Sequence, residues 1–132
     1  MSQYNGKTAR FMTLAKNVAN QSTYSDYRHG AVLVRGGSVI NTSPNKDGHC
    51  AFAKRFRKRE EGIATVHAEV GAILGLDRSV TEGATLYVAR IGKSGEFRMS
   101  KPCNMCVAVL KHCGVKKVVF TIDKEEVGRY KL

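Results

Sequence analysis

Two short segments of the chain carry side chains that bind metals and move protons. His67 and Glu69 are separated by a single residue, and Cys103, which follows Pro102, precedes Cys106 by one helical turn. Two cysteines at this spacing share one face of a helix, and the positive end of the helix dipole favours their thiolate forms. Histidine and cysteine are preferred ligands of Zn²⁺, so the three side chains indicate a metal site with His67 as the third ligand.

Three protein ligands suit a zinc ion that takes part in a reaction. A structural zinc is held by four protein ligands, whereas a catalytic zinc keeps its fourth position for water. The ion lowers the pKa of that water from about 15.7 toward roughly 7, which makes hydroxide available at neutral pH. A neighbouring carboxylate, such as that of Glu69, can take the proton of the water and deliver it to a leaving group. The pattern therefore predicts zinc-assisted hydrolysis.

Other interpretations of the cysteines and histidines stay open. Cys103 and Cys106 alone are also typical of a structural zinc or a redox pair, although the added His-Ala-Glu segment favours catalysis. Cys113 does not complete the ligand set, because seven helical residues span about 10.5 Å, and it is predicted to be a buried thiol. His49 and Cys50 either hold a second, structural zinc or are ordinary loop residues.

The elements that must position these residues follow from hydrophobic periodicity. Spacings typical of amphipathic helices occur at 8–22, 66–76 and 102–113, and a basic helix is predicted at 51–61. Strand-like runs occur at 30–34, 38–42, 85–91 and 115–121, with a glycine pair that suits a tight turn between the first two. The segment 92–101 is predicted to be a loop.

The order of these elements predicts an α/β fold in which helices cover a mixed sheet. Fewer residues follow Thr121 than the roughly dozen that a parallel crossover needs, so any last strand, over 129–132, is expected to pair antiparallel with the strand before it. Both chemical segments then stand where helices begin.

The chain has 132 residues, of which 42% are hydrophobic and 25% charged. This length and composition are typical of one folded domain, which is expected to span residues 1–132. No apolar run reaches the roughly 20 residues of a membrane helix, and the first residues lack the apolar core of a secretory signal. We therefore expect a cytoplasmic protein without a membrane partner.

The charge of the chain is strongly positive. Its 22 lysines and arginines outnumber its 11 aspartates and glutamates, which gives a formal charge of +11. Such a charge makes nucleotides or nucleic acids the expected partners. The basic run from Lys54 to Arg59 has two interpretations: a path for phosphates, with Phe52 or Phe56 stacking on a base, or a solvated helix face with both phenylalanines in the core.

The pattern H-x-E followed by P-C-x-x-C is the signature of zinc-dependent nucleobase deaminases. On these motifs, and on strand-like segments from about Gly30 to Thr121, the sequence resembles the cytidine/deoxycytidylate deaminase superfamily, and most of all its small viral and bacterial deoxycytidylate deaminase-like members. The resemblance implies a three-layer α-β-α cytidine deaminase-like sandwich with a mixed four- or five-stranded sheet. It also implies that Zn²⁺ is bound by His67, Cys103 and Cys106, and that Glu69 is the proton shuttle.

Four further residues are candidates for contact with a substrate. The family usually places an asparagine that touches the sugar after its second strand; Asn45 matches this position, although Asn41 competes with it and a turn asparagine needs no ligand. The resemblance also implies that a backbone N–H near Ala68 contacts the base. Phe97 and Arg98, in the segment that leads to the cysteines, are placed to meet the base and the phosphate, unless the ring packs on its own strand.

Together these observations predict hydrolytic deamination of cytosine to uracil in a cytidine nucleotide such as dCMP, with ribose or deoxyribose left open. One alternative is deamination of cytosine or adenine in single-stranded DNA or RNA, which suits the charge of +11. A second alternative is a zinc-containing domain that binds nucleic acid without catalysis. Family members commonly self-associate, so the resemblance implies a homo-oligomer.

Overall fold

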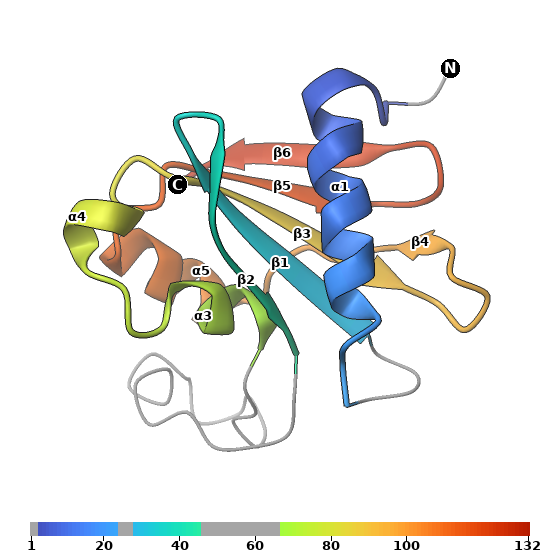
Figure 1. Ribbon diagram of the computed structural model, residues 1–132, viewed down its shortest axis with the longest axis horizontal. Helices are drawn as coiled ribbons and strands as arrows, with labels where there is room; N and C mark the ends of the chain where they lie inside the picture. The colour runs from blue at the N-terminus through green and yellow to red at the C-terminus, as the bar shows by residue number, and fades with distance from the viewer. Residues whose placement is uncertain (1–2, 24–27, 46–66) are drawn as a thin grey trace.

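The computed structural model describes residues 3–23, 28–45 and 67–132. Within these residues a mixed sheet of six strands has the order β2-β1-β3-β5-β6, with β4 paired to β3 (Figure 1). The strands are β1 Arg28–Arg35, β2 Ser38–Pro44, β3 Thr85–Ile91, β4 Phe97–Arg98, β5 Lys117–Thr121 and β6 Val127–Lys131. The helices of the same part of the chain are α1 Gly6–Ala19, α3 Ala68–Ile73, α4 Arg78–Thr81 and α5 Asn104–His112.

Alternating side chains of the central strands build two hydrophobic cores. On β3, Leu86 and Val88 belong to a core shared with α3 and α5, whereas Tyr87 and Ala89 belong to a core shared with α1. Successive residues of a strand point to opposite faces of the sheet, so helices cover both faces and three layers result. The α/β sandwich expected from the sequence is confirmed.

The direction of strand pairing decides where α5 begins. β3 and β5 are parallel, and the other strand pairs of the described residues are antiparallel. Because α5 runs back between two parallel strands, its N-terminus lies where β3 and β5 finish. The Ser100 N–H accordingly donates to the carbonyl of Thr121, the last residue of β5, at 2.9 Å. The antiparallel pairing of the last strand, β6 with β5, is as predicted.

The predicted hairpin between the first two strands is present. Arg35 pairs with Ser38, which leaves Gly36 and Gly37 as a two-residue turn between β1 and β2. Their φ angles are 60° and 80°, and glycine enters this left-handed region without steric cost. The glycine pair therefore sets the register of the pairs next to the turn, and an irregularity between Leu33 and Val34 shifts the register of the rest of β2 by one residue.

The sheet contains more strands than the predicted four or five. β4 lies inside the segment 92–101, for which the sequence predicted a loop, and it pairs with β3 through Arg90 with Arg98 and Ile91 with Phe97. Two residues are too few to show an alternating hydrophobic pattern, so periodicity could not reveal this strand.

The helices also differ in length from the prediction. α3 ends at Ile73 because Leu74 has an extended backbone, with φ −62° and ψ 130°, and the short α4 follows. α5 begins at Asn104, so Pro102 precedes the helix. The predicted basic helix at 51–61, with the run from Lys54 to Arg59, and the pair His49 and Cys50 lie outside the described residues. None of the helices in the described ranges is long and apolar enough to span a membrane.

Candidate metal centre

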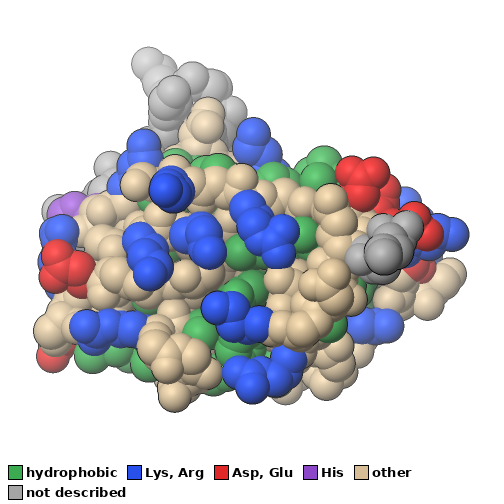
Figure 2. Space-filling view, turned by 90° about the horizontal axis from the view of Figure 1, so that it is seen from above, with side chains coloured by type: hydrophobic (Ala, Val, Ile, Leu, Met, Phe, Trp, Pro, Cys, Tyr) green, Lys and Arg blue, Asp and Glu red, His purple; other side chains and the backbone are tan. Residues whose placement is uncertain are grey.

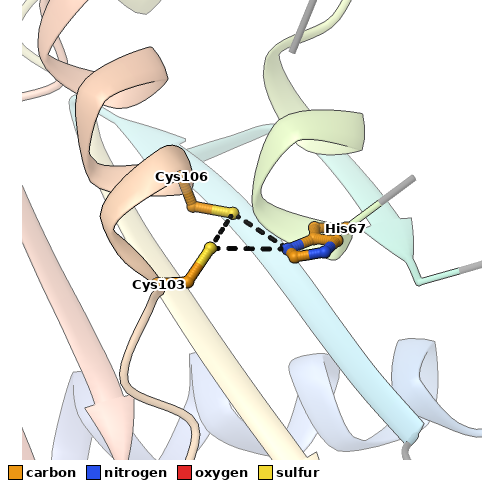
Figure 3. A group of neighbouring side chains, drawn as sticks. All are labelled: His67, Cys103 and Cys106. Atoms are coloured by element: carbon orange, nitrogen blue, oxygen red, sulfur yellow. Dashed lines mark hydrogen bonds between the residues drawn. The ribbon is translucent and has the colours of Figure 1, made fainter. Parts of the chain in front are cut away.

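Three potential metal ligands from two helix N-termini meet beside the sheet (Figure 3). The Nδ1 atom of His67 lies 3.2 Å from Sγ of Cys106 and 3.7 Å from Sγ of Cys103, and the two sulfur atoms are 3.6 Å apart. His67 is the N-cap residue of α3 and Cys103 is the N-cap residue of α5, both with extended backbones. Cys106 stands in the first turn of α5, where the helix dipole favours a thiolate.

These distances fit a zinc ion. A tetrahedral Zn²⁺ with bonds of about 2.05 Å to nitrogen and about 2.3 Å to sulfur separates a nitrogen from a sulfur by about 3.6 Å and two sulfurs by about 3.8 Å. The measured separations lie within about 0.4 Å of these values. One nitrogen and two sulfurs are also a donor set that zinc prefers, so the residues present suit the ion as three ligands.

The two thiols have unequal proton affinities. A hydrogen bond from Cys106, together with His67, lowers the pKa of Cys103 to about 4. The same hydrogen bond and burial raise the pKa of Cys106 well above its usual value. The two sulfur atoms lie 3.6 Å apart, and a divalent cation bound between them would stabilise both thiolates.

Glu69 lies in the first turn of α3, next to this cluster, and is only 5% exposed. Burial is the main cause that raises the pKa of its carboxyl group, and the hydrogen bond to its own backbone N–H opposes the effect. Ala68, the first residue of α3, is fully buried. The carboxyl group of Glu69 therefore lies close enough to His67 and the two cysteines for all three to affect its pKa.

Asn45 and Asn41 hold the end of the hairpin. Asn45 accepts the N–H of His29 through Oδ1 at 2.9 Å and donates its own N–H to the carbonyl of His29 at 3.1 Å. Asn41 donates from Nδ2 to the carbonyl of Ala72 at 3.0 Å, which joins β2 to α3. Both side chains therefore have a structural partner, and the sugar contact expected of Asn45 stays a prediction.

Phe97 lies apart from the metal ligands. Its ring stacks on that of Tyr4, with centroids 4.7 Å apart and an interplanar angle of 11°, and it packs against the core that faces α1. The ligands stand on the other face of the sheet, with α3 and α5. The structure does not bring Phe97 to the candidate site, because the alternation along β4 turns its ring toward α1.

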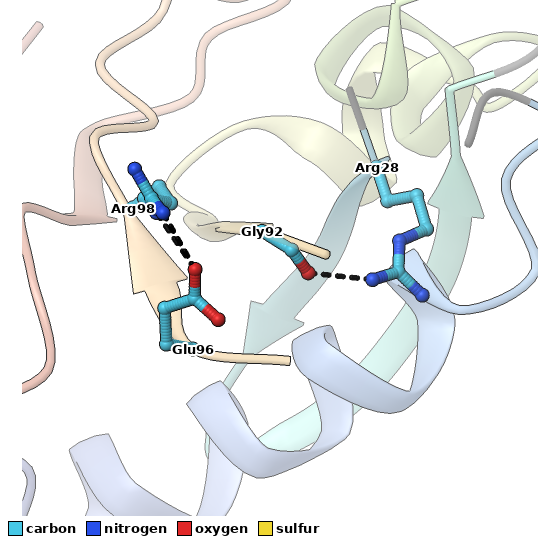
Figure 4. A network of polar contacts seen from close by, with 4 residues as sticks. All are labelled: Arg28, Gly92, Glu96 and Arg98. Atoms are coloured by element: carbon cyan, nitrogen blue, oxygen red, sulfur yellow. Dashed lines mark hydrogen bonds and ion pairs between the residues drawn. The ribbon is translucent and has the colours of Figure 1, made fainter. Parts of the chain in front are cut away.

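Arg98 and the turn before it form a polar network (Figure 4). Arg98 is 57% exposed, and its Nη2 donates to Oε1 of Glu96 at 2.7 Å. Arg28 reaches the other side of the turn, where its Nη2 donates to the carbonyl of Gly92 at 2.6 Å. To bind a substrate phosphate, the Arg98 guanidinium group would have to break its ion pair with Glu96 or bind both anions at once.

The sequence pattern did not identify two further residues that lie near the site. Ser100 is buried, and its hydroxyl joins the carbonyl of Val88 to the backbone N–H of Thr121, just before the segment that carries the cysteines. Tyr130 on β6 contacts Phe120 edge to face, and its buried hydroxyl has no hydrogen-bond partner in the structure. Burial raises the pKa of Tyr130, and the charges of Glu69 and the two cysteines add to this.

Comparisons with known proteins agree with this geometry. The model of the family "Cytidine and deoxycytidylate deaminase zinc-binding region" matches residues 6–122. A deoxycytidylate deaminase of Mycobacterium phage D29 is 28% identical over 125 residues, covering 83% of this chain and 90% of the phage protein. The human deoxycytidylate deaminase is 28% identical over 124 residues, covering 86% of this chain and 64% of the human protein. This chain therefore spans less than two thirds of the human relative.

Solved structures show the same fold. A dCMP deaminase of the cyanophage S-TIM5 superposes with a TM-score of 0.58 at 19% identity, covering 85% of this chain and 79% of that one. A structure from studies of A-to-I editing by tRNA:A34 deaminases has a TM-score of 0.56 at 27% identity, with 87% and 76% covered. The zinc-binding region that names the matched family agrees with the expected Zn²⁺ cofactor and with the three converging ligand atoms. The chain belongs to the cytidine and deoxycytidylate deaminase family.

Proposed function

We propose that the protein deaminates the cytosine base of a cytidine nucleotide such as dCMP, producing the uracil nucleotide and ammonia. The observation that carries this proposal is the meeting of His67, Cys103 and Cys106 beside the buried carboxyl group of Glu69. The phage and human relatives named deoxycytidylate deaminase support a nucleotide as the substrate.

In this proposal His67, Cys103 and Cys106 hold the zinc ion. Zinc bound by three protein ligands supplies Lewis acidity and lowers the pKa of a water molecule at its fourth position. The backbone N–H of Ala68, at the beginning of α3, is the proposed contact to the base. Asn45 is the proposed contact to the sugar, and Arg98 the proposed contact to the phosphate.

Glu69 moves the protons. Its carboxylate takes a proton from the attacking water and gives it to N3 of the pyrimidine while the bond from oxygen to C4 forms. It then takes the second proton and gives it to the amino group, so that the bond from C4 to nitrogen breaks and ammonia leaves. Burial suits this role because water does not compete for the carboxyl group, and because the protonated form that the second half of the reaction needs is favoured.

The test compares three variants of the zinc-loaded protein on dCMP. Glu69→Gln should lower kcat by about 100-fold or more while the zinc content stays at the wild-type value, since proton transfer typically contributes about 10²- to 10⁴-fold. Cys106→Ser should lose both zinc and activity. Cys113→Ser, whose half-buried thiol stands outside the cluster, should keep both. Deamination measured for none of cytidine, CMP, dCMP and dCTP would contradict the proposal.

A second candidate substrate is a base within a polynucleotide. The 27% identity to a chain from studies of tRNA:A34 deaminases, over 87% of this chain, favours including RNA among the substrates tested. Mass spectrometry of single-stranded DNA and RNA oligonucleotides, incubated with the wild type and with Glu69→Gln, distinguishes this activity. Turnover of oligonucleotides without turnover of dCMP would replace the nucleotide as the proposed substrate.

A further inference from the structure

A concave site lies at the opposite end of the sheet from the metal centre. Its volume is about 210 Å³, and its wall comes from the β1–β2 turn, the beginning of α1 and the first residues of β3 and β5. The metal ligands stand where β3 and β5 finish, so the two sites occupy opposite ends of these parallel strands. The pocket also faces α1, because it is lined by Val34 and Tyr87 of the core on that side.

Positive charge dominates this pocket. Four of its lining residues are cations, namely Lys7, Arg35, Lys116 and Lys117, and no acidic residue lines it. The sheet continues the charge beside the pocket, since Lys131 pairs with Lys117 across β5 and β6. Arg10 donates from Nη2 to the carbonyl of Gly37 in the pocket wall at 3.3 Å. Arg129 pairs with Val119, which in turn pairs with Tyr87 of the wall. We call this region the basic surface; it comprises Lys7, Arg10, Arg35, Lys116, Lys117, Arg129 and Lys131.

The face that carries the basic surface shows few acidic side chains near its centre (Figure 2). Figure 2 views the end of the molecule where α1 begins and the β1–β2 turn lies, and Lys and Arg side chains spread over the middle of that face. Asp and Glu side chains are seen at its two sides. Cations therefore outnumber anions over the middle of this face (Figure 2).

Among the described residues, no acidic side chain forms an ion pair with the cations of the basic surface. Lys7, Lys116 and Lys117 form no ion pair there, and the arginines donate to neutral oxygens. Arg35 donates to the carbonyl of Ser79 at 2.7 Å, and Arg129 donates to the hydroxyl of Thr8 at 2.7 Å. Like charges directly opposite each other on paired strands, as in Lys117 and Lys131, destabilise a sheet. An external anion would remove this repulsion.

The size of the pocket and the charge around it identify the kind of anion. Sites for whole small molecules occupy about 300 to 1,000 Å³, so a pocket of about 210 Å³ suits a single phosphate group better than a complete nucleotide. Cations continue outside the pocket along β6 and α1, where neighbouring phosphates of a chain would lie. We propose that the basic surface binds the phosphodiester backbone of a single-stranded nucleic acid, with one phosphate in the pocket. This inference does not depend on the proposed deamination.

The proposed binding is independent of base sequence. Contacts to phosphate position a protein on nucleic acid but carry no sequence information. The large hydrophobic side chains that are exposed in the described residues are Val39, Leu74 and Met99, so no exposed aromatic ring is available here for stacking on bases. Affinity should then come from the release of counterions and should fall steeply with salt.

Two variants with the same net charge test the proposal. Lys7→Glu/Lys116→Glu reverses two cations of the pocket, and Lys111→Glu/Lys124→Glu reverses two exposed lysines elsewhere; each pair lowers the formal charge from +11 to +7. Fluorescence anisotropy with a labelled oligothymidylate of about 20 nucleotides, between about 50 and 200 mM salt, gives the affinity and its salt dependence.

We expect the pocket variant to lose at least about tenfold in affinity and to reduce the slope of log K against log salt by about 0.7, the value for the one phosphate that the pocket holds. The control pair should keep most of the affinity and the slope. Equal losses in the two variants, or wild-type protein that binds inorganic phosphate but no oligonucleotide, would overturn the proposal.

Deamination of dCMP and the melting temperature, measured in parallel, report on the metal centre and on folding. If the charge reversal unfolds the protein, Lys7→Gln/Lys116→Gln and Lys111→Gln/Lys124→Gln give the same comparison.

Discussion

Ser100 is the residue that fastens the cysteine-bearing segment to the sheet. Its hydroxyl donates to the carbonyl of Val88 at 2.9 Å and accepts the N–H of Thr121 at 2.8 Å, and the Thr121 hydroxyl donates to it at 2.8 Å. Because Cys103 follows three residues later, this buried network sets the position of one zinc ligand through the backbone. We therefore expect Ser100 to be a positioning residue for the metal centre.

Replacing Ser100 by alanine should lower the free energy of unfolding by about 1 to 3 kcal/mol, since buried polar partners are left unsatisfied. It should also weaken zinc binding, which a competition titration with a chromophoric chelator measures. Ser79→Ala, on an exposed position of α4, is the control and should change neither quantity. A Ser100→Ala protein that loses stability but keeps the wild-type zinc affinity would show that the network supports the fold alone.

Two tyrosines allow a comparison of hydroxyls with and without a hydrogen-bond partner. The hydroxyl of Tyr130 is buried without a partner, whereas that of Tyr4 donates to the carbonyl of Asp123 at 2.7 Å. Tyr130→Phe should leave the free energy of unfolding unchanged or raise it, because an unsatisfied polar group is removed. Tyr4→Phe should lower it by about 1 kcal/mol. Urea unfolding of both variants checks the difference, and the opposite order would contradict it.

The close contact between α1 and β1 requires glycine at position 30, because glycine has no Cβ atom. A Cβ atom on Gly30 would lie 2.5 Å from the backbone nitrogen of Ala19 and closer still to the carbonyl oxygen of Ala15. Both are backbone atoms of α1 and cannot turn away, so the helix lies directly on the strand. The layer formed by α1 can approach the sheet this closely only where glycine stands.

Gly30→Ala should therefore lower the free energy of unfolding by about 3 kcal/mol, at the upper end of the usual cost of overpacking. Gly83→Ala is the comparison, because Gly83 has open space around a Cβ atom but a φ of +78°. It should cost only about 1 kcal/mol, from backbone strain. Chemical denaturation of the two variants measures both costs, and equal values would show that α1 can shift.

Asp123 organises the turn between β5 and β6. Its Oδ1 accepts the N–H groups of Glu125 and Glu126, both at 2.8 Å. These hydrogen bonds lower the pKa of the carboxyl group below its ordinary value of 3.8. The folded state therefore holds the Asp123 carboxylate more strongly than the unfolded state does. The resulting stabilisation is complete above the pKa of the unfolded chain, and it is lost as the pH falls through the lower pKa of the folded chain.

Asp123→Ala should therefore lower the melting temperature at pH 7, and the difference from the wild type should shrink as the pH falls below about 3.8. Thermal unfolding followed by circular dichroism between about pH 2 and 7 measures this. A difference that stays constant with pH would show that the charge of Asp123 does not contribute.

At the scale of the whole molecule, the metal centre connects segments that are distant along the chain. His67 comes from α3 and the cysteines come from α5, so zinc binds only the folded arrangement. Removal of zinc by a chelator should lower the melting temperature of the wild type, because a ligand present at 100 times its Kd adds about 2.7 kcal/mol of stability. Cys106→Ser should melt lower from the start and should not respond to the chelator. An unchanged melting temperature after verified loss of zinc would contradict this.

Some properties of the whole molecule stay predictions. These are a single domain over residues 1–132, a cytoplasmic location and a homo-oligomer, which were expected from composition and resemblance. Light scattering at several protein concentrations measures the oligomeric state. A strict monomer would contradict the expectation.

The sequence by itself determined the chemical segments and the elements that carry them. The spacing of His67, Glu69, Cys103 and Cys106, and the hydrophobic periodicity around them, depend on residues close together along the chain. The hairpin at Gly36 and Gly37 and the antiparallel last strand followed from the same kind of local information.

Only the tertiary structure decided which of these residues meet. The distances between His67 and the two sulfur atoms depend on how α3 and α5 pack on a common sheet, and the face on which Phe97 lies depends on the pairing of β4 with β3. Likewise, Ser100, Tyr130 and the basic surface have no local signature, because strand pairing brings their partners from distant parts of the chain. Local patterns set what each segment can do; long-range packing sets which segments act together.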